Sequence, residues 1–123
     1  MITDTHTHLY SEQFNEDRTE MIQRAKDAGV SRFFIPAIDS SYTKSMLDLE
    51  TNFKDDVFLM MGLHPTSVKE NYKDELAHVK EWIDKRSFFA IGEIGIDLYW
   101  DKSFLAQQQE AFRTQIQWAK EKK

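Results

Sequence analysis

The sequence contains no cysteine among its 123 residues. Disulfide bonds and thiolate metal sites are therefore excluded, and any metal ion must be held by histidine, aspartate or glutamate. The chain also has no surplus of basic residues, because 16 lysines and arginines stand against 21 acidic residues, for a net charge of −5. This balance disfavours a protein that holds nucleic acid through a broad basic surface. It leaves open an enzyme that meets phosphates through bound cations.

Long apolar runs are missing as well. No stretch approaches the ~20 residues of a membrane span, and the first residues lack the basic and apolar character of a signal peptide. We therefore expect a soluble protein of the cytoplasm, without membrane contact. Hydrophobic residues make up 41% of the chain and charged residues 30%, a normal balance for a folded protein. The length suits one domain or part of a larger one, and we treat residues 1–123 as one unit.

Short apolar runs alternate with helical patterns four times along the chain. We expect strands near residues 2–8, 32–38, 57–62 and 88–93, and helices near residues 17–28, 41–52, 74–85 and 104–122. The expected inward stripe of the last helix is Leu105, Gln108, Phe112, Ile116 and Ala119. Successive β-then-α units imply parallel strands with right-handed crossovers. An open doubly wound sheet and the first four units of a TIM-like (β/α)8 barrel, which needs about 250 residues, are both compatible with this pattern.

Polar residues follow the strand ends, where active sites form in either architecture. The first strand ends in His6 and His8, the third in His64 and the fourth in Glu93. Asp39 follows the second strand, but it carries less weight because aspartate is also a common helix cap. The expected site is therefore a cluster of histidines and a carboxylate at one edge of the sheet.

The stretch Asp4-Thr5-His6-Thr7-His8 places two histidines two positions apart. In an extended strand they share one face, roughly 6.5 Å apart along the strand. Two imidazoles so placed can converge on one cation, and Asp4 behind them could orient a ligand through a hydrogen bond. A strand end with two solvated histidines is the alternative that this spacing leaves open.

Glu93 and His64 each allow a functional and a plain interpretation. A carboxylate directly after a buried strand is costly unless it is paired or binds metal, and its two oxygens can bridge two cations. A capping acid in a glycine turn is the alternative for Glu93. His64 precedes Pro65, which favours an extended backbone and suits a phosphate contact or a proton transfer. A loop histidine without a role is the alternative there.

Three further features are weaker. Tyr99 and Trp100 favour packing in a lid or core, although aromatic rings also stack on nucleobases. Lys102 could meet a phosphate, but most exposed lysines have no specific partner. His78 lies among charged residues in the third helix, and we expect it on a solvated surface.

Three stretches together resemble the TatD family of metal-dependent hydrolases. They are DTHTHL at residues 4–9, GLHP at 62–65 and GEIGIDLYWD at 92–101, followed by Gln109 and Phe112 in a helix. The resemblance covers the whole chain in the right order. It implies a (β/α)8 barrel of roughly twice this length, of which these residues form the first four units, a half barrel. Characterised members of the family are divalent-metal nucleases, several of them 3′–5′ exonucleases on DNA.

The resemblance also implies roles for particular residues. His6 and His8 bind one metal ion and Glu93 bridges two, while Asp4 supports the ligands from behind. Candidates for substrate contact or catalysis are His64, Asp97 and Tyr99. The family binds up to two divalent ions (Zn, Mn or Mg), and we expect one or none in this chain. The remaining ligands, two histidines and an aspartate from the second half of the barrel, have no counterpart in this sequence.

The expected function is cleavage of phosphodiester bonds, in DNA or another phosphoester, by a metal-activated water. Residues 1–123 alone should hydrolyse weakly or not at all, and a second barrel half or a second copy should be needed to close the fold. The alternative is a non-catalytic, metal-binding half barrel that acts through self-association or a partner.

Overall fold

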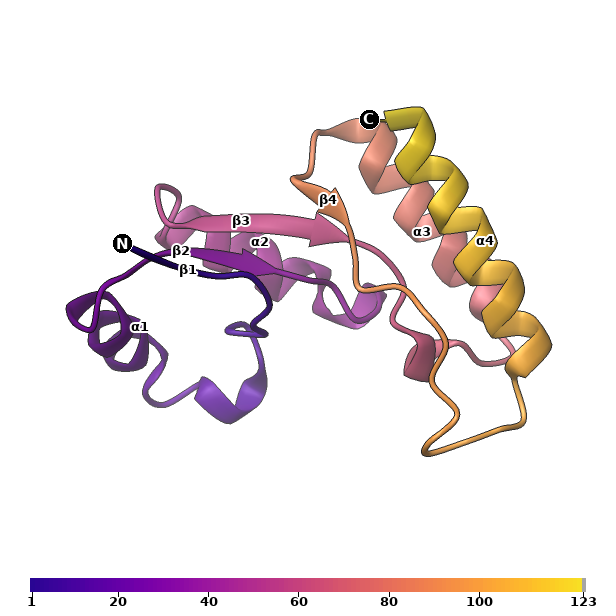
Figure 1. Ribbon diagram of the computed structural model, residues 1–123, viewed down its shortest axis with the longest axis horizontal. Helices are drawn as coiled ribbons and strands as arrows, with labels where there is room; N and C mark the ends of the chain where they lie inside the picture. The colour runs from indigo at the N-terminus through magenta and orange to yellow at the C-terminus, as the bar shows by residue number, and fades with distance from the viewer. Residues whose placement is uncertain (123) are drawn as a thin grey trace.

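The computed structural model describes residues 1–122, and it shows a parallel sheet with helices between successive strands (Figure 1). The strands are β1 (Ile2–Asp4), β2 (Val30–Ile35), β3 (Val57–Met61) and β4 (Ala90–Ile91). The α-helices are α1 (Arg18–Asp27), α2 (Thr43–Asn52), α3 (Tyr72–Lys85) and α4 (Leu105–Lys122). Short 3-10 helices are η1 (Glu12–Phe14), η2 (Ser40–Tyr42) and η3 (Pro65–Ser67). Among residues 1–122, no helix combines the length and apolar character needed to cross a membrane.

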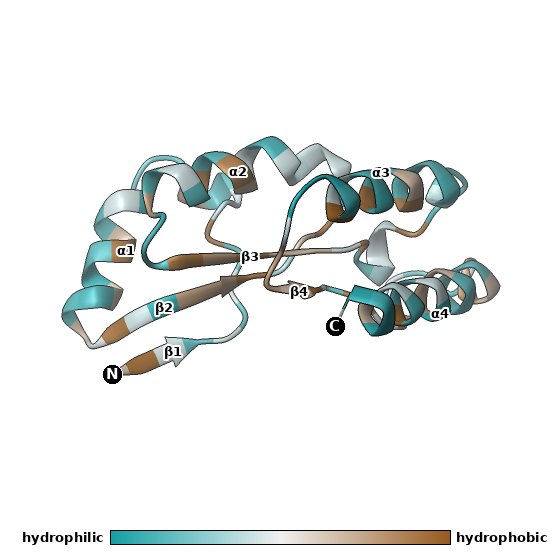
Figure 2. Ribbon diagram, turned by 90° about the horizontal axis from the view of Figure 1, so that it is seen from above, coloured by the Kyte–Doolittle hydropathy of each residue, from teal (hydrophilic) through white to brown (hydrophobic). Residues whose placement is uncertain are grey.

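The order of the strands decides between the two architectures. Each strand pairs in parallel with the next one along the chain, in the order β1-β2-β3-β4. Figure 2 shows α1, α2 and α3 along one side of β1, β2 and β3, and α4 beside β4 at the end of the sheet. A doubly wound sheet reverses its strand order and carries helices on both faces. The structure therefore confirms the predicted half barrel.

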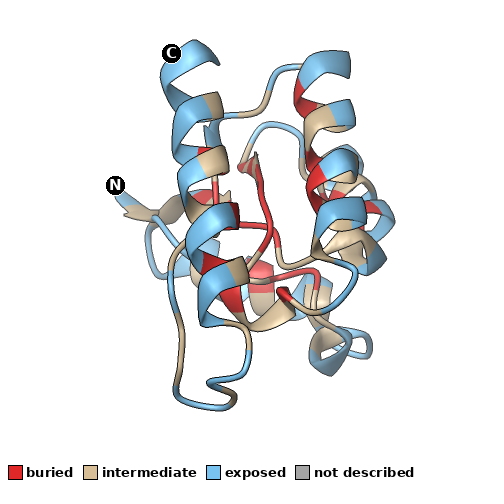
Figure 3. Cartoon of the chain, turned by 90° about the vertical axis from the view of Figure 1, so that its right-hand side faces the viewer, coloured by how far each residue is buried: buried red, intermediate tan, exposed pale blue. Residues whose placement is uncertain are grey.

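The hydrophobic core lies between this sheet and its helices (Figure 3). Alternate residues of β2 and β3 point toward the helices and are buried, as parallel strands under helices require. The core includes Phe33, Ile35, Val57, Leu59 and Met61 from the strands, and Ile22, Met46, Leu49, Val79 and Ile83 from the helices.

The other face of the sheet is lined by aromatic rings. Phe34 stacks on Phe89 with ring centroids 4.4 Å apart, and Phe58 joins them edge-on. Phe89 remains 61% exposed. In a closed barrel this face would point into the barrel interior.

The first and last strands are shorter than the sequence suggested. β1 ends at Asp4 rather than His8, because Asp4 Oδ1 accepts a hydrogen bond from His6 N at 3.1 Å and the chain turns there. His6 and His8 therefore lie beyond the strand, not on one of its faces. β4 holds Ala90 and Ile91 alone, and the chain then turns toward the end of β2.

The predicted inward stripe of α4 was partly wrong. Leu105 and Ile116 are each 39% exposed. The buried positions are Gln108, Ala111 and Gln115. Gln115 is buried because its Oε1 accepts a hydrogen bond of 2.7 Å from Leu63 N, next to the end of β3. A polar side chain thus takes the core-facing position because it accepts a hydrogen bond from a backbone N–H of the loop after β3 that would otherwise be buried without a partner.

His78 also differs from the expected solvated surface residue. It is partly buried, and its Nε2 lies 2.8 Å from the hydroxyl of Thr43 at the start of α2. It is a link between two helices.

Candidate metal centre

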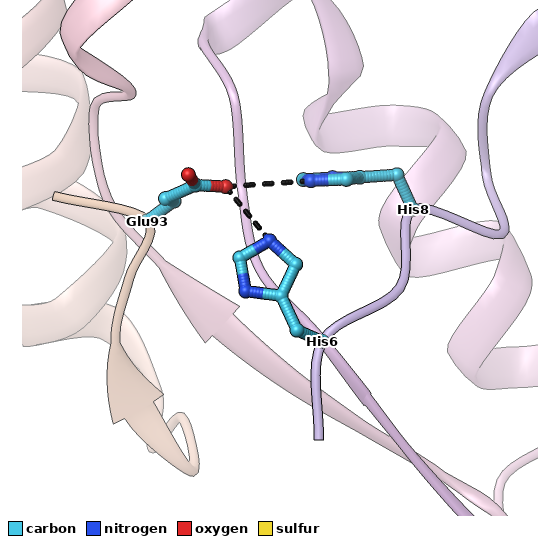
Figure 4. A group of neighbouring side chains, drawn as sticks. All are labelled: His6, His8 and Glu93. Atoms are coloured by element: carbon cyan, nitrogen blue, oxygen red, sulfur yellow. Dashed lines mark ion pairs between the residues drawn. The ribbon is translucent and has the colours of Figure 1, made fainter. Parts of the chain in front are cut away.

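Three histidines from two strand ends converge on Glu93. His6 Nε2 lies 3.0 Å and His8 Nε2 lies 3.4 Å from Glu93 Oε2 (Figure 4). His64 Nε2 lies 3.1 Å from the other carboxylate oxygen, Oε1. The structure thus brings together the residues that the sequence placed after the first, third and fourth strands.

The backbone around Gly92 carries Glu93 toward the histidines. Gly92 N donates to Met61 O at 3.0 Å, and Gly92 O accepts from Ala37 N at 2.9 Å. Gly62 allows this approach, since a Cβ atom there would lie 2.9 Å from the carbonyl carbon of Gly92. The short fourth strand is therefore locked to the ends of β2 and β3, and Glu93 is held in a defined position.

Tyr10 determines which nitrogen of His8 carries the proton. The Tyr10 hydroxyl donates to Pro36 O at 2.7 Å, because a carbonyl can only accept. His8 Nδ1 lies 2.9 Å from the same hydroxyl, so Nδ1 must donate to it. The Nε2 of neutral His8 then presents a lone pair toward Glu93.

The burial of His8 also favours its neutral form. It lowers the pKa of His8 below its ordinary value, against the opposing attraction of the Glu93 carboxylate. Burial also raises the pKa of Tyr10, which keeps its hydroxyl protonated as the donor to Pro36. His8 therefore offers the neutral imidazole that metal coordination requires.

His64 has the opposite arrangement. Its Nδ1 accepts a hydrogen bond of 3.1 Å from Thr66 N, and the Thr66 hydroxyl lies 2.8 Å away. A backbone N–H can only donate, so Nδ1 carries the lone pair and the proton of the neutral ring lies on Nε2. His64 Nε2 therefore donates to Glu93 Oε1. This histidine is built as a hydrogen-bond donor.

The geometry fits a cation between Glu93 and the two histidines after β1. Glu93 Oε2 is buried, and no group within the described residues donates a hydrogen bond to it. It faces the lone pair of His8, an arrangement of two electron-rich atoms that a shared cation would stabilise. One ligand atom each from His6, His8 and Glu93 lies within 4.8 Å of the others. Two imidazole nitrogens and a carboxylate form a ligand set that suits Zn²⁺, Mn²⁺ and related divalent ions.

The carboxylates of three other predicted residues, Asp4, Asp97 and Asp39, each accept a hydrogen bond from a backbone N–H. Asp4 accepts the backbone N–H of His6, so it orients the chain segment rather than an imidazole ring. Asp97 Oδ1 accepts the backbone N–H of Tyr99 in the loop before α4. Asp39 accepts from Ser41 N at 3.0 Å, which is the helix-capping role that reduced its weight as a site residue.

Sequence reasoning missed Tyr10 and Thr66. Each lies two residues after a histidine of the cluster and bonds to the Nδ1 of that histidine. The two-residue spacing is the signal that could have found them, because the hydrogen-bond partner of one ring nitrogen fixes the tautomer of a histidine.

A half barrel of parallel strands that gathers histidines and a carboxylate at its C-terminal edge has the architecture of barrel-type metal-dependent hydrolases. Residues 3–123 match the family model described as TatD related DNase. The chain belongs to the TatD family of metal-dependent hydrolases.

Individual relatives agree with this assignment. The chain is 36% identical over 121 residues to the uncharacterized metal-dependent hydrolase YabD of Bacillus subtilis, covering 98% of this chain and 47% of that protein. It is 31% identical over 118 residues to the 3′-5′ ssDNA/RNA exonuclease TatD of Erwinia tasmaniensis, covering 96% and 46%. The crystal structure of the TatD homologue YjjV from Escherichia coli superposes with a TM-score of 0.87 at 30% identity, covering 98% and 47%. The chain thus spans about half the length of the relatives it matches.

Proposed function

We propose that this chain provides the first, metal-binding half of a TatD-type hydrolase that cleaves phosphodiester bonds. The observation that carries the proposal is the buried Glu93 Oε2, which has no hydrogen-bond donor among residues 1–122 and faces two histidine nitrogens. The name of the Erwinia tasmaniensis relative, a single-stranded DNA and RNA exonuclease, supports nucleic acid as the substrate.

Each residue of the cluster has a distinct role in this proposal. His6, His8 and Glu93 would hold a divalent ion, and Tyr10 would keep the lone pair of His8 directed at it. Such an ion supplies Lewis acidity, drawing charge from phosphate oxygens and making water more acidic. Zn, Mn and Mg are all compatible with the ligand types.

His64 contributes a proton donor rather than a ligand. Its Nε2–H points at Glu93 Oε1 beside the proposed ion, and Thr66 holds the ring from behind. The same N–H could donate to a phosphate oxygen of the substrate, which would orient the scissile group and offset its charge.

Residues 1–123 alone should bind metal but hydrolyse weakly or not at all. The cluster supplies three ligand side chains, and a two-ion phosphodiesterase site needs a shell around each ion. DNA or another phosphoester is therefore the substrate of the longer barrel, completed by a second half or a second copy.

A non-catalytic half barrel that associates through its open face is the second candidate. The observation that favours it is the aromatic face of Phe34, Phe58 and Phe89, in which Phe89 is 61% exposed. A hydrophobic face of this kind is typical of an association surface.

Metal stoichiometry and cleavage separate these proposals. Isothermal titration with Mn²⁺ or Zn²⁺ should show one ion per chain, and a labelled single strand should stay intact with this chain alone. Cleavage should appear when the remaining half of a full-length relative completes the barrel. A chain that binds no divalent ion would contradict the metal centre, and rapid cleavage by the chain alone would contradict its dependence on a second half.

A further inference from the structure

The loop between β4 and α4 is anchored by hydrogen bonds before Tyr99 and Trp100. Gln108, buried on α4, accepts a hydrogen bond of 2.8 Å from Asp97 N and donates one of 3.0 Å to Asp97 O. Asp97 Oδ1 in turn accepts from Tyr99 N at 3.0 Å. The backbone that enters Tyr99 is therefore bonded to the helix on both its N–H and C=O groups.

The same loop is anchored after Trp100 by Asp101. Its Oδ1 accepts from Ser103 N at 2.7 Å, and its Oδ2 lies 3.3 Å from Lys69 Nζ. These bonds hold the pKa of Asp101 below its ordinary value, which keeps it charged and bonded. Tyr99 and Trp100 thus lie between two anchored points.

These two aromatic residues nevertheless project into solvent. Tyr99 is 81% exposed and Trp100 is 78% exposed, so packing in the core, one of the two interpretations that the sequence suggested, is wrong for the described residues. Their rings contact each other edge-to-face, with centroids 4.7 Å apart and an interplanar angle of 83°. The loop is hydrogen-bonded on both sides of these rings, and it holds both of them in water. The rings therefore offer a surface on which a flat apolar ligand can stack.

Trp100 is linked to the metal centre through η3. Trp100 lines a small pocket together with Pro65 and Thr66 of η3. Thr66 bonds His64, and His64 contacts Glu93. Figure 1 shows the loop, in orange, extending past the C-terminal end of β3 on the side where η3 lies.

We propose that Tyr99 and Trp100 form a stacking platform for an unpaired nucleobase of a single-stranded nucleic acid whose phosphate lies at the Glu93 centre. This inference rests on the proposed phosphodiester hydrolysis and names the part of the substrate that the loop recognises. Every nucleobase has a flat face that stacks on an aromatic ring, whereas a duplex keeps those faces inside. The net charge of −5 gives little general attraction for phosphates, and stacking supplies affinity that this surface charge does not.

The test measures binding of fluorescent oligothymidylate and of an abasic strand of equal length, by anisotropy, at low salt and with EDTA. The 123-residue chain is compared with Trp100→Ala, Trp100→Leu and Trp100→Phe. Ile116→Ala is the control, because Ile116 is also an exposed apolar side chain but lies on α4 and not in the loop. Melting curves confirm that each variant is folded.

Trp100→Ala should weaken oligothymidylate binding by roughly tenfold, and leave the abasic strand unaffected. Trp100→Phe should retain most of the affinity, Trp100→Leu should behave like Trp100→Ala, and Ile116→Ala should match the parent chain. The platform is overturned if Trp100→Ala binds oligothymidylate as tightly as the parent chain, or loses the same affinity for both strands. It is also overturned if Trp100→Leu keeps the full affinity, or if the parent chain does not bind oligothymidylate. Because EDTA removes metal ions, these results stand apart from the metal titration that tests the proposed function.

Discussion

His8, after β1, and His64, after β3, both direct Nε2 at the carboxylate of Glu93, but their other ring nitrogens meet opposite partners. His8 Nδ1 faces the Tyr10 hydroxyl, whose own proton is committed to a carbonyl. His64 Nδ1 faces the backbone N–H of Thr66. The first ring must therefore donate through Nδ1, and the second must accept through it.

This difference teaches that one residue type serves two kinds of chemistry in one cluster. His8 presents a lone pair, as a metal ligand must, and His64 presents a proton, as a phosphate partner must. The residue two positions along the chain from each histidine determines the assignment. Predictions that separate the two histidines therefore test the whole site.

The largest effect is expected from Glu93→Gln, which removes the carboxylate that both histidines face. Affinity for Mn²⁺ or Zn²⁺ should fall by more than about 100-fold, since even residues behind a ligand account for 10- to 100-fold. Isothermal titration measures the change, and Glu20→Gln on the exposed face of α1 is the control. Equal affinity of the Glu93→Gln variant and the control would remove Glu93 from the metal centre.

Next in size is the contrast between His8→Ala and His64→Ala. The first should weaken metal binding by roughly 100-fold because it deletes a ligand, and the second should change it by less than about fivefold. His78→Ala, which alters a histidine bonded to Thr43 on another part of the chain, controls for loss of any histidine. If both variants lost metal equally, the two histidines would have the same role and the comparison would fail.

A smaller effect is expected from Tyr10→Phe. Without the hydroxyl, His8 Nδ1 loses the partner that fixes its proton, and metal affinity should fall about tenfold. Tyr42→Phe is the matched control, because its ring packs 5.4 Å from that of Tyr10 while its hydroxyl bonds Glu12. A Tyr10→Phe variant with the metal affinity of Tyr42→Phe would show that the tautomer of His8 does not depend on Tyr10.

The smallest effect is expected from Thr66→Val, which removes the hydroxyl and keeps the backbone N–H that bonds His64. Metal affinity should stay unchanged, and the free energy of unfolding should fall by about 1 kcal/mol. Urea denaturation measures this, with Thr51→Val on the exposed side of α2 as the comparison. A clear loss of metal affinity would place His64 among the ligands.

Much of the fold and part of the site could be predicted from the sequence. The four β-then-α units follow from local patterns, and the polar residues after β1, β3 and β4 follow from the rule that parallel strands gather their C-terminal ends. The resemblance to the TatD family then named His6, His8 and Glu93, and the geometry brings these three together.

The features that the sequence did not predict depend on contacts between segments far apart in the chain. Gln115 is buried because it meets Leu63, 52 residues earlier, and no periodicity in α4 contains that information. The proton of His8 depends on a carbonyl at Pro36, 26 residues from Tyr10. The exposure of Tyr99 and Trp100 depends on anchors outside the aromatic pair itself. The aromatic character of these residues predicts that their rings pack in a lid or core. The hydrogen bonds of the loop instead hold both rings in solvent.

The most direct test of the two histidine roles is ¹⁵N NMR of the imidazole rings in this chain, before and after addition of Zn²⁺. His8 should carry its proton on Nδ1, and His64 should carry a proton on Nε2. Zinc should shift the Nε2 signals of His6 and His8 to values of coordinated nitrogen and leave His64 protonated at Nε2. An Nε2–H tautomer for His8, or a coordinated His64, would contradict the account.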